Sequence, residues 1–285
     1  MNAEISEIFR YPVKSMGGHS LTRTDLTERG IPGDRAWTVK DEERGGIKGG
    51  KRFPELMAMD ARLQEEPSSD VLSPPVLITL PDGTEVTNSA PDVHERLSAA
   101  IGSPVTLWPL LPADQLDHYL RTPPEPGQDL EAGLREVFAR TADEPLPDLA
   151  QFPEFLMQYE SPPGTYFDAY PLLIMSSTSL ASMQAAATES VIDVRRFRPN
   201  IVLNVDATGY PEDAWAGQRA RLGTAELQLE MACPRCVMTT HGFKDLPKDP
   251  KVMRHLVQAN GGNLGLYASV LTPGTIAVGD QLELI

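Results

Sequence analysis

The chain has 285 residues, of which 41% are hydrophobic, so it is long enough to bury a full core and to form one large or two modest domains. Its 25 Lys and Arg against 40 Asp and Glu give a net charge of -15, which argues against nucleic acid and against a membrane as partner, because both are bound through basic surfaces. Two cysteines are too few for a disulfide framework, and neither a targeting signal nor a long apolar run is visible, so we expect a cytoplasmic protein.

The first 105 residues are predicted to form a small, mostly antiparallel β domain. Strands are expected over 5–14, 19–27, 34–39, 56–64 and 76–87. The last of these folds into a hairpin at Pro81-Asp82-Gly83. A helix is expected over 91–101, because a proline starts the segment, apolar residues recur at helical spacing and Gly102 stops it. The glycine-rich stretch 45–52, which ends in Lys51 and Arg52, is predicted to be a solvated loop.

Residues 106–165 are predicted to be a connecting segment. Twelve of the 26 prolines lie between Pro104 and Pro171, and eleven acidic residues against three basic ones lie between Pro112 and Glu160. Such a composition cannot bury enough apolar surface to form a core of its own, so we expect one short helix at about 130–139. A solvated spacer is favoured over an acidic docking surface for a partner.

Residues 166–285 are predicted to form the second domain. A short buried strand over 171–175 leads into a helix over 176–187, whose hydroxyl-rich start could seat an anion. Three arginines in four residues, Arg195, Arg196 and Arg198, precede the next strand. Further strands are expected over 201–205, 225–231, 264–271 and 276–285, the last two forming a pair, with a short helix over 252–257.

Both cysteines, Cys233 and Cys236, lie at the end of a predicted strand. Arg235 directly precedes Cys236, and a fixed cation nearby stabilises a thiolate, which is both a nucleophile and a metal ligand. The pair could also be two buried hydrophobes, or a redox Cys-x-x-Cys, although the following Val-Met-Thr-Thr predicts extended chain rather than the required helix. A structural zinc site needs two more ligands, and His241 and His255 lack the usual spacing.

A single ligating thiolate in a pocket is the remaining interpretation. One cysteine sulfur can bind a soft metal, but it cannot be a metal site alone, so the other ligands must come from a cofactor. A large anionic organic cofactor with its own sulfur donors would explain both the lone thiolate and the surplus of basic residues.

Five motifs carry a resemblance to a known family. They are Tyr11-Pro-Val-Lys-Ser15, Gly33-Asp-Arg-Ala-Trp37, Phe197-Arg-Pro-Asn200, Cys233-Pro-Arg-Cys236 followed by Thr239-Thr240, and Asn263-Leu-Gly-Leu-Tyr267. In this order they resemble MOSC-domain proteins of the subgroup with an N-terminal MOSC β-barrel domain, which includes the mitochondrial amidoxime reducing components and bacterial relatives. The resemblance covers about 5–86 and 171–285. It implies a mainly β (α+β) fold, with an N-terminal antiparallel β domain and a C-terminal MOSC β-barrel with a few helices.

The resemblance also implies a molybdenum cofactor, in which molybdenum is held by the dithiolene of a molybdopterin and by one protein cysteine. On that pattern Cys236 is the metal ligand and the catalytic residue. The other residues that match cofactor contacts of the family are Lys14, Ser15, Arg35, Thr178, Ser179, Arg198, Asn200, Pro234 and Arg235. Cys233 is read as packing, and no pyridoxal phosphate is expected. Whether Lys51 and Arg52 line the pocket is left open.

The implied activity is the reduction of N-hydroxylated compounds such as amidoximes, hydroxylamines and N-hydroxylated bases. An iron–sulfur domain would need four more cysteines than the chain has, so electrons are expected from a separate ferredoxin-like or haem protein with its own reductase. The alternative is a molybdenum-cofactor binding or sulfur-carrier protein that uses a persulfide of Cys236, because a partly exposed thiol of low pKa would serve either role.

Overall fold

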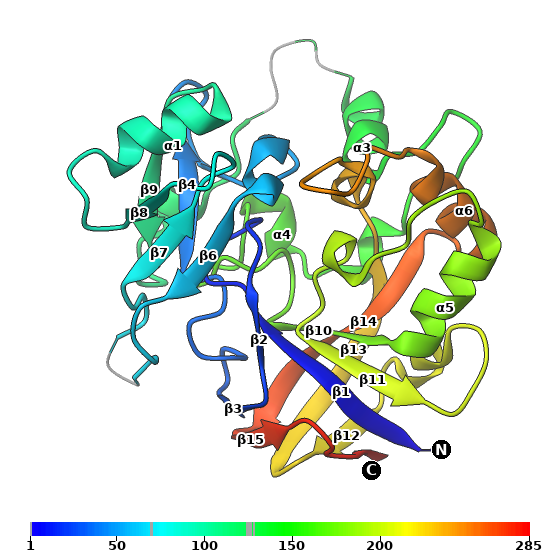
Figure 1. The fold of residues 1–285 in the computed structure, drawn as a ribbon. Helices are drawn as coiled ribbons and strands as arrows, with labels where there is room; N and C mark the ends of the chain where they lie inside the picture. The colour runs from blue at the N-terminus through cyan, green and yellow to red at the C-terminus, as the bar shows by residue number, and fades with distance from the viewer. Residues whose placement is uncertain (1, 69–70, 124–126, 128) are drawn as a thin grey trace.

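The fold is mainly β, as expected, and is built around one large sheet (Figure 1). The computed structural model describes residues 2–68, 71–123, 127 and 129–285. The sheet has eight strands in the order β16-β12-β13-β14-β10-β11-β1-β2. Their bounds are β1 Ala3–Arg10, β2 His19–Leu21, β10 Leu172–Ser176, β11 Ile201–Val205, β12 Arg219–Leu222, β13 Ala225–Pro234, β14 Asn263–Thr272 and β16 Leu282–Leu284. Strands β10 and β11 are parallel, and every other neighbouring pair in this sheet is antiparallel.

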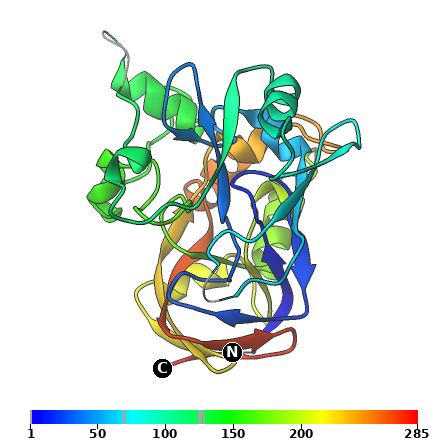
Figure 2. The same ribbon diagram turned by 90° about the vertical axis from the view of Figure 1, so that its left-hand side faces the viewer.

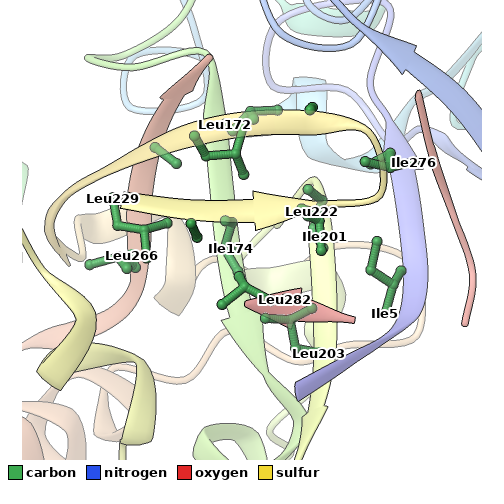
Figure 3. Close-up of a cluster of buried hydrophobic side chains, with 14 of the residues drawn as sticks. Ile5, Leu172, Ile174, Ile201, Leu203, Leu222, Leu229, Leu266, Ile276 and Leu282 are labelled. Carbon is green, nitrogen blue, oxygen red and sulfur yellow. The ribbon is translucent and has the colours of Figure 1, made fainter. Parts of the chain in front are cut away.

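The sheet curls so that its two ends approach each other. The Ile5 amide donates to the Asp280 carbonyl (2.9 Å), which brings the residues before β16 back to β1. The two chain ends therefore lie at the same end of the molecule (Figures 1 and 2). Along β13 the burial alternates strictly, because successive side chains of a strand point to opposite faces. Its inner face joins Ile174, Leu203 and Leu266 in the main core (Figure 3).

Three smaller sheets complete the β structure. One has the order β5-β4-β9 (Ile47–Lys48, Trp37–Asp41, Val105–Pro109), and another the order β6-β7-β8 (Asp60–Leu63, Val76–Thr79, Glu85–Thr87). The third pairs β3 (Arg23–Leu26) with β15 (Gly274–Ala277). Helix α1 (Val93–Ile101) packs its apolar face into a hydrophobic cluster of the N-terminal part that is separate from the main core. Leu97 is fully buried in it.

Local signals in the N-terminal part were predicted well, and strand lengths less well. The hairpin at 81–83 joins β7 and β8, and α1 ends at Gly102 with a φ of 78°. The strand expected over 5–14 ends at Arg10, because Pro12 cannot donate to a ladder. The stretch 19–27 divides into β2 and β3, which belong to different sheets, and 56–64 begins with a 3-10 turn, Pro54–Ala58.

The acidic segment contains the expected helix as α3 (Leu130–Phe138), together with two single turns, α2 (Leu116–Tyr119) and α4 (Phe155–Gln158). It also packs on the N-terminal part: its Tyr119 and Tyr159, with Tyr166 just beyond it, form a buried cluster with Ile47 of β5. The domain boundaries, 1–105, 106–165 and 166–285, stay a prediction. Strands β1 and β2 hydrogen-bond into the same sheet as the C-terminal strands.

In the C-terminal part the helix predicted over 176–187 is α5 (Ser177–Ala186), capped by the hydroxyl of Ser176. The helix predicted over 252–257 is longer, α6 (Lys251–Asn260). Two expectations were wrong. Residues Val237–Thr240 form a 3-10 turn, η5, rather than extended chain, and β15 and β16 pair with β3 and β12 rather than with β14. No helix in the described ranges is long and apolar enough to cross a membrane.

Candidate functional site

A buried carboxylate, Asp34, joins the three segments that begin the site. Its Oδ1 accepts from the Tyr11 amide (2.7 Å) at the end of β1, and its Oδ2 accepts from Nδ2 of Asn200 (3.0 Å) at the start of β11. The Arg35 guanidinium forms an ion pair with the same carboxylate. Asp34 therefore fixes Arg35 and Asn200, both predicted site residues, against the end of β1.

Two guanidinium groups lie over the ring of Tyr11. The Cζ of Arg198 is 4.3 Å from the ring centre and that of Arg35 is 5.4 Å, both within cation–π range. The Tyr11 hydroxyl donates to the Pro199 carbonyl (3.0 Å), which fixes the ring. Burial, and then the charge of Arg35, lowers the pKa of Arg198 to about 10. The Nη2 of Arg198 is buried and finds no acceptor among the described residues.

Lys14 connects the N-terminal part to the end of the acidic segment. Its Nζ donates to the Ser161 hydroxyl (3.1 Å), the Tyr166 carbonyl (2.8 Å) and Oδ1 of Asp168 (2.8 Å). Lys51 lies 3.6 Å from the other carboxylate oxygen of Asp168. Burial would raise the pKa of Asp168, but Lys14 and Lys51 outweigh it and hold that pKa well below its usual range. Burial lowers the pKa of Lys14 itself.

Backbone strain gathers at the same residues. Five non-glycine residues of the described chain have a positive φ, and three of them are predicted site residues: Ser15 (69°), Arg35 (48°) and Arg198 (58°). Non-glycine residues rarely adopt this conformation, and where they do, the strain is often at a functional site. The Ser15 hydroxyl accepts from the Gly50 amide (2.8 Å), which holds the glycine-rich loop against the site.

The two cysteines have different environments. Cys233, on β13, is 1% exposed, and its sulfur accepts from Nη1 of Arg235 (3.0 Å); burial raises the pKa of its thiol. Cys236 is half-buried, directly precedes η5, and packs beside the cluster that contains Met238. Arg235 also donates from Nη2 to the Phe197 carbonyl (2.6 Å), and its Nε is buried without a partner in the described chain. Of the two free thiols, only that of Cys236 is partly open to solvent.

Thr178 and Ser179, two further predicted site residues, make no hydrogen bond to the residues described above. They begin α5, at the opposite end of β10 from Leu173, whose amide donates to Oδ1 of Asn200 (3.2 Å). The Ser179 hydroxyl donates to the fully buried carboxylate of Glu212 (2.6 Å), and the Thr178 hydroxyl donates to a backbone carbonyl of β11 (2.8 Å). The helix start predicted as an anion seat is thus filled by a carboxylate of the chain itself.

Lys51 and Arg52, the basic pair that ends the glycine-rich loop, have different partners. Asp168 raises the pKa of Lys51, and the charge of Cys236 contributes in the same direction, so Lys51 lies in the electrostatic range of the thiol. Arg52 donates instead to Asp41 (3.2 Å) and stacks over the Phe53 ring. Lys51 therefore shares Asp168 with Lys14, whereas Arg52 pairs with a different carboxylate.

The assembled residues form a cation cluster, which we define as Lys14, Arg35, Lys51, Arg198 and Arg235. Among the described residues, its ion pairs are with two carboxylates, those of Asp34 and Asp168, so five cations minus these two anions leave an excess of three positive charges. In a chain of net charge -15 this excess is local. A cluster of this charge beside a half-exposed thiol suits an anionic ligand.

Family comparisons agree with the five motifs. The MOSC N-terminal beta barrel domain matches residues 2–100, and the MOSC domain matches residues 162–283. The chain belongs to the MOSC-domain proteins with an N-terminal MOSC β-barrel domain. In this MOSC protein the cation cluster lies where the two matched segments meet. Lys14, Arg35 and Lys51 come from the first segment, whereas Arg198 and Arg235 come from the second.

Curated relatives match the chain over nearly its whole length. The "Mitochondrial amidoxime reducing component 2" of Bos taurus is 25% identical over 98% of this chain and 82% of its own. The "Mitochondrial amidoxime-reducing component 1" of Mus musculus is 26% identical over 99% of this chain and 82% of its own. The crystal structure of the YUAD protein from Bacillus subtilis is 13% identical, with a TM-score of 0.43, over 100% of this chain and 96% of that one.

The residues that sequence reasoning missed are Tyr11, Asp34 and Asp168. Tyr11 and Asp34 stand inside two of the quoted motifs, so motif membership was the available signal. Asp168 follows the proline-rich segment, and no local pattern singles it out. Its contacts with Lys14 and Lys51 form only in the folded chain.

Proposed function

We propose that this protein is a molybdenum-cofactor-dependent oxidoreductase that reduces N-hydroxylated compounds such as amidoximes, hydroxylamines and N-hydroxylated bases. The observation that carries the proposal is the half-exposed Cys236 beside a cation cluster with an excess of three positive charges. The names of the relatives, which are amidoxime reducing components, support the substrate class.

The cluster fits a large anionic cofactor. Two of its guanidinium nitrogens, Nη2 of Arg198 and Nε of Arg235, are buried without an acceptor in the described chain. A buried donor left unpaired costs about 1–3 kcal/mol, so both nitrogens favour a ligand rich in acceptor oxygens. A molybdopterin with its terminal phosphate is such a ligand. When bound, it supplies two-electron redox chemistry at molybdenum, with the Cys236 sulfur as the protein ligand.

The chain's own residues would bind the cofactor and orient it. Lys14, Arg35 and Arg198 would neutralise the phosphate, with Ser15 and Asn200 beside them and Pro234 and Arg235 next to the sulfur. The strain at Ser15, Arg35 and Arg198 is consistent with side chains aimed in advance at one ligand. Thr178 and Ser179 remain predicted contacts, without a hydrogen bond to this cluster.

Electrons would come from a separate partner. The sequence has two cysteines, and both lie beside this site, whereas an iron–sulfur cluster is held by four. A ferredoxin-like or haem protein with its own reductase is therefore the proposed donor. The proposal keeps the cytoplasm as the compartment, where both thiols remain reduced.

Metal content and thiol substitution test the proposal together. Protein purified from a host that makes the cofactor should carry stoichiometric molybdenum and should reduce a test amidoxime with a reduced dye as donor. Cys236→Ser should lose the metal and bring turnover to background, because serine does not replace a thiolate ligand. Cys233→Ser is the matched control and should keep the metal, since Cys233 is 1% exposed and its sulfur accepts from Arg235 inside the protein.

Two results would contradict the assignment. Wild-type protein without molybdenum, together with a persulfide at Cys236, would establish the sulfur-carrier alternative instead. Full activity in Cys236→Ser combined with none in Cys233→Ser would show that the other thiol is the ligand.

A further inference from the structure

Arg196 is the largest fully buried side chain in the described part of the molecule, and the cation cluster does not include it. Its guanidinium donates only to main-chain carbonyls. The acceptors are those of Val191 (3.0 Å), Thr239 (3.2 Å), His241 (2.9 Å) and Pro247 (2.8 Å). Burial of a cation is costly unless its donors are satisfied, and burial lowers the pKa of Arg196 although the charges of Asp249 and Asp193 act in the opposite direction. The structural role of Arg196 is therefore to hold these four carbonyls.

Three of these four acceptors belong to the segment that directly follows Cys236. Within this segment, the Thr239 amide (3.2 Å) and hydroxyl (3.0 Å) both donate to the Cys236 carbonyl. Arg196 therefore holds Thr239, and Thr239 in turn holds the backbone carbonyl of Cys236, the residue with the half-exposed thiol. The turn η5 has four residues, too few to be stable by itself, so its order depends on contacts from outside.

The neighbours of Arg196 in the chain contact the same region in other ways. The side chain of Arg195 is 42% exposed and forms ion pairs with Asp193 and with Asp245, which lies in the segment after Cys236. Arg198 belongs to the cation cluster, and the Phe197 carbonyl accepts from Arg235. Arg196 is thus the buried link between the run that carries Arg198 and the turn that carries Cys236.

We propose that Arg196 is a positioning residue for Cys236. By holding the carbonyls of residues 239–247, it fixes the turn relative to Arg198, so that the thiol and the guanidinium face one ligand. The inference rests on the proposed function only for the identity of that ligand. The placement of the turn is a property of the chain alone.

Thiol reactivity of the full-length chain, made in a host without the cofactor, tests the proposal. Cys233 is 1% exposed, so iodoacetamide followed by peptide mass spectrometry reports Cys236. Arg196→Met should raise the alkylation rate of Cys236 about tenfold, because three carbonyls of the segment after Cys236 lose a donor and that segment opens more often. Amide exchange in a peptide covering residues 237–249 should rise in parallel. Arg196→Lys should give an intermediate rate, since an ammonium cannot reach all four carbonyls as a guanidinium does.

Two controls separate positioning from general destabilisation. Arg195→Met removes an exposed ion pair to the same segment and should leave the alkylation rate at the wild-type value. Leu203→Ala weakens the main core, which does not include the residues of η5, and should lower overall stability without changing the rate.

A wild-type rate in Arg196→Met, or an equal rise in Leu203→Ala, overturns the proposal. If Arg196→Met does not fold, Arg196→Lys decides it in the same way. Because no molybdenum is present in this experiment, its outcome does not depend on the proposed activity. A wild-type chain that never binds molybdenum but shows the expected change in thiol reactivity would refute the reductase and retain the positioning role.

Discussion

Asp34 is the residue on which the geometry of the cation cluster depends most directly. Replacing it by alanine would remove the acceptor of the Tyr11 amide, the ion-pair partner of the Arg35 guanidinium and the shorter of the two hydrogen bonds that Nδ2 of Asn200 donates. Breaking a buried ion pair by removing one partner costs about 3–5 kcal/mol, so Asp34→Ala should lower the free energy of unfolding by that amount. Urea denaturation followed by fluorescence measures it.

Asp245→Ala is the matched control, because Asp245 also pairs with an arginine but its side chain is 69% exposed. It should leave the unfolding midpoint unchanged, since exposed ion pairs contribute little. An equal loss of stability in both variants would show that Asp34 has no special structural role.

The backbone conformation of the strained residues could not be predicted from the sequence. Ser15, Arg35 and Arg198 were found because they stand in recognisable motifs, but nothing in their residue types predicts a positive φ. Asn200 was likewise found by its motif, whereas its hydrogen bonds to Asp34 and Leu173 exist only after β10 and β11 have come together. The motifs singled out several residues that the fold brings together, but neither Asp34 nor Asp168 nor the contacts that orient them.

At the scale of elements, prediction succeeded where the signal was local. Gly102 stops α1, Pro81-Asp82-Gly83 turns the hairpin, and Ser176 caps α5, each through a short-range effect on backbone conformation. Strand partners were predicted poorly, because pairing is decided by contacts distant in sequence. Strand β15 leaves its chain neighbour β14 and pairs with β3, some 250 residues away in sequence, through Thr275 and Asp25.

Helix α3 offers a test of local backbone strain inside the acidic segment. It ends at Ala139, whose left-handed conformation (φ 49°) is unfavourable for a residue with a Cβ. Ala139→Gly should slow amide exchange over residues 130–140, raising the local opening free energy by about 0.5–1 kcal/mol, part of the gain being offset by the loss of a packed methyl group. Hydrogen exchange read by mass spectrometry measures this.

Ala132→Gly in the same helix should act in the opposite direction, because glycine costs about 1 kcal/mol relative to alanine in a helix. Faster exchange in both variants would mean that the cap conformation does not limit the helix.

At the scale of the whole molecule, the site lies where the two family domains meet, and the acidic segment closes it. The end of that segment returns to the N-terminal part through the Ser161 hydroxyl, and the Tyr166 carbonyl just beyond it also accepts from Lys14. Tyr119 and Tyr159 of the segment pack with Tyr166 near β5. A segment whose composition predicted a solvated spacer therefore packs on the folded chain and leads directly to Asp168 of the site, which composition alone could not indicate.

This arrangement makes stability depend on pH through Asp168. Its pKa is held well below the usual value by Lys14 and Lys51, so the folded state takes up this proton less readily than the unfolded state. The contribution of Asp168 to stability is complete above the unfolded pKa of about 3.9 and is lost as the pH falls from there through the folded pKa. Because the side chain is 44% exposed, solvent screening reduces the size of the effect but not its sign.

The wild-type unfolding free energy should therefore fall more steeply below pH 4 than that of Asp168→Asn, which carries no titrating group at this position. Above the unfolded pKa the variant should be the less stable protein, because Lys14 and Lys51 lose their carboxylate partner, and the two curves should converge in acid. Urea denaturation at a series of pH values gives both curves. Parallel acid limbs for the two proteins would show that the contact between Asp168 and the lysines, and with it the join between the two halves of the site, does not contribute to the folded state.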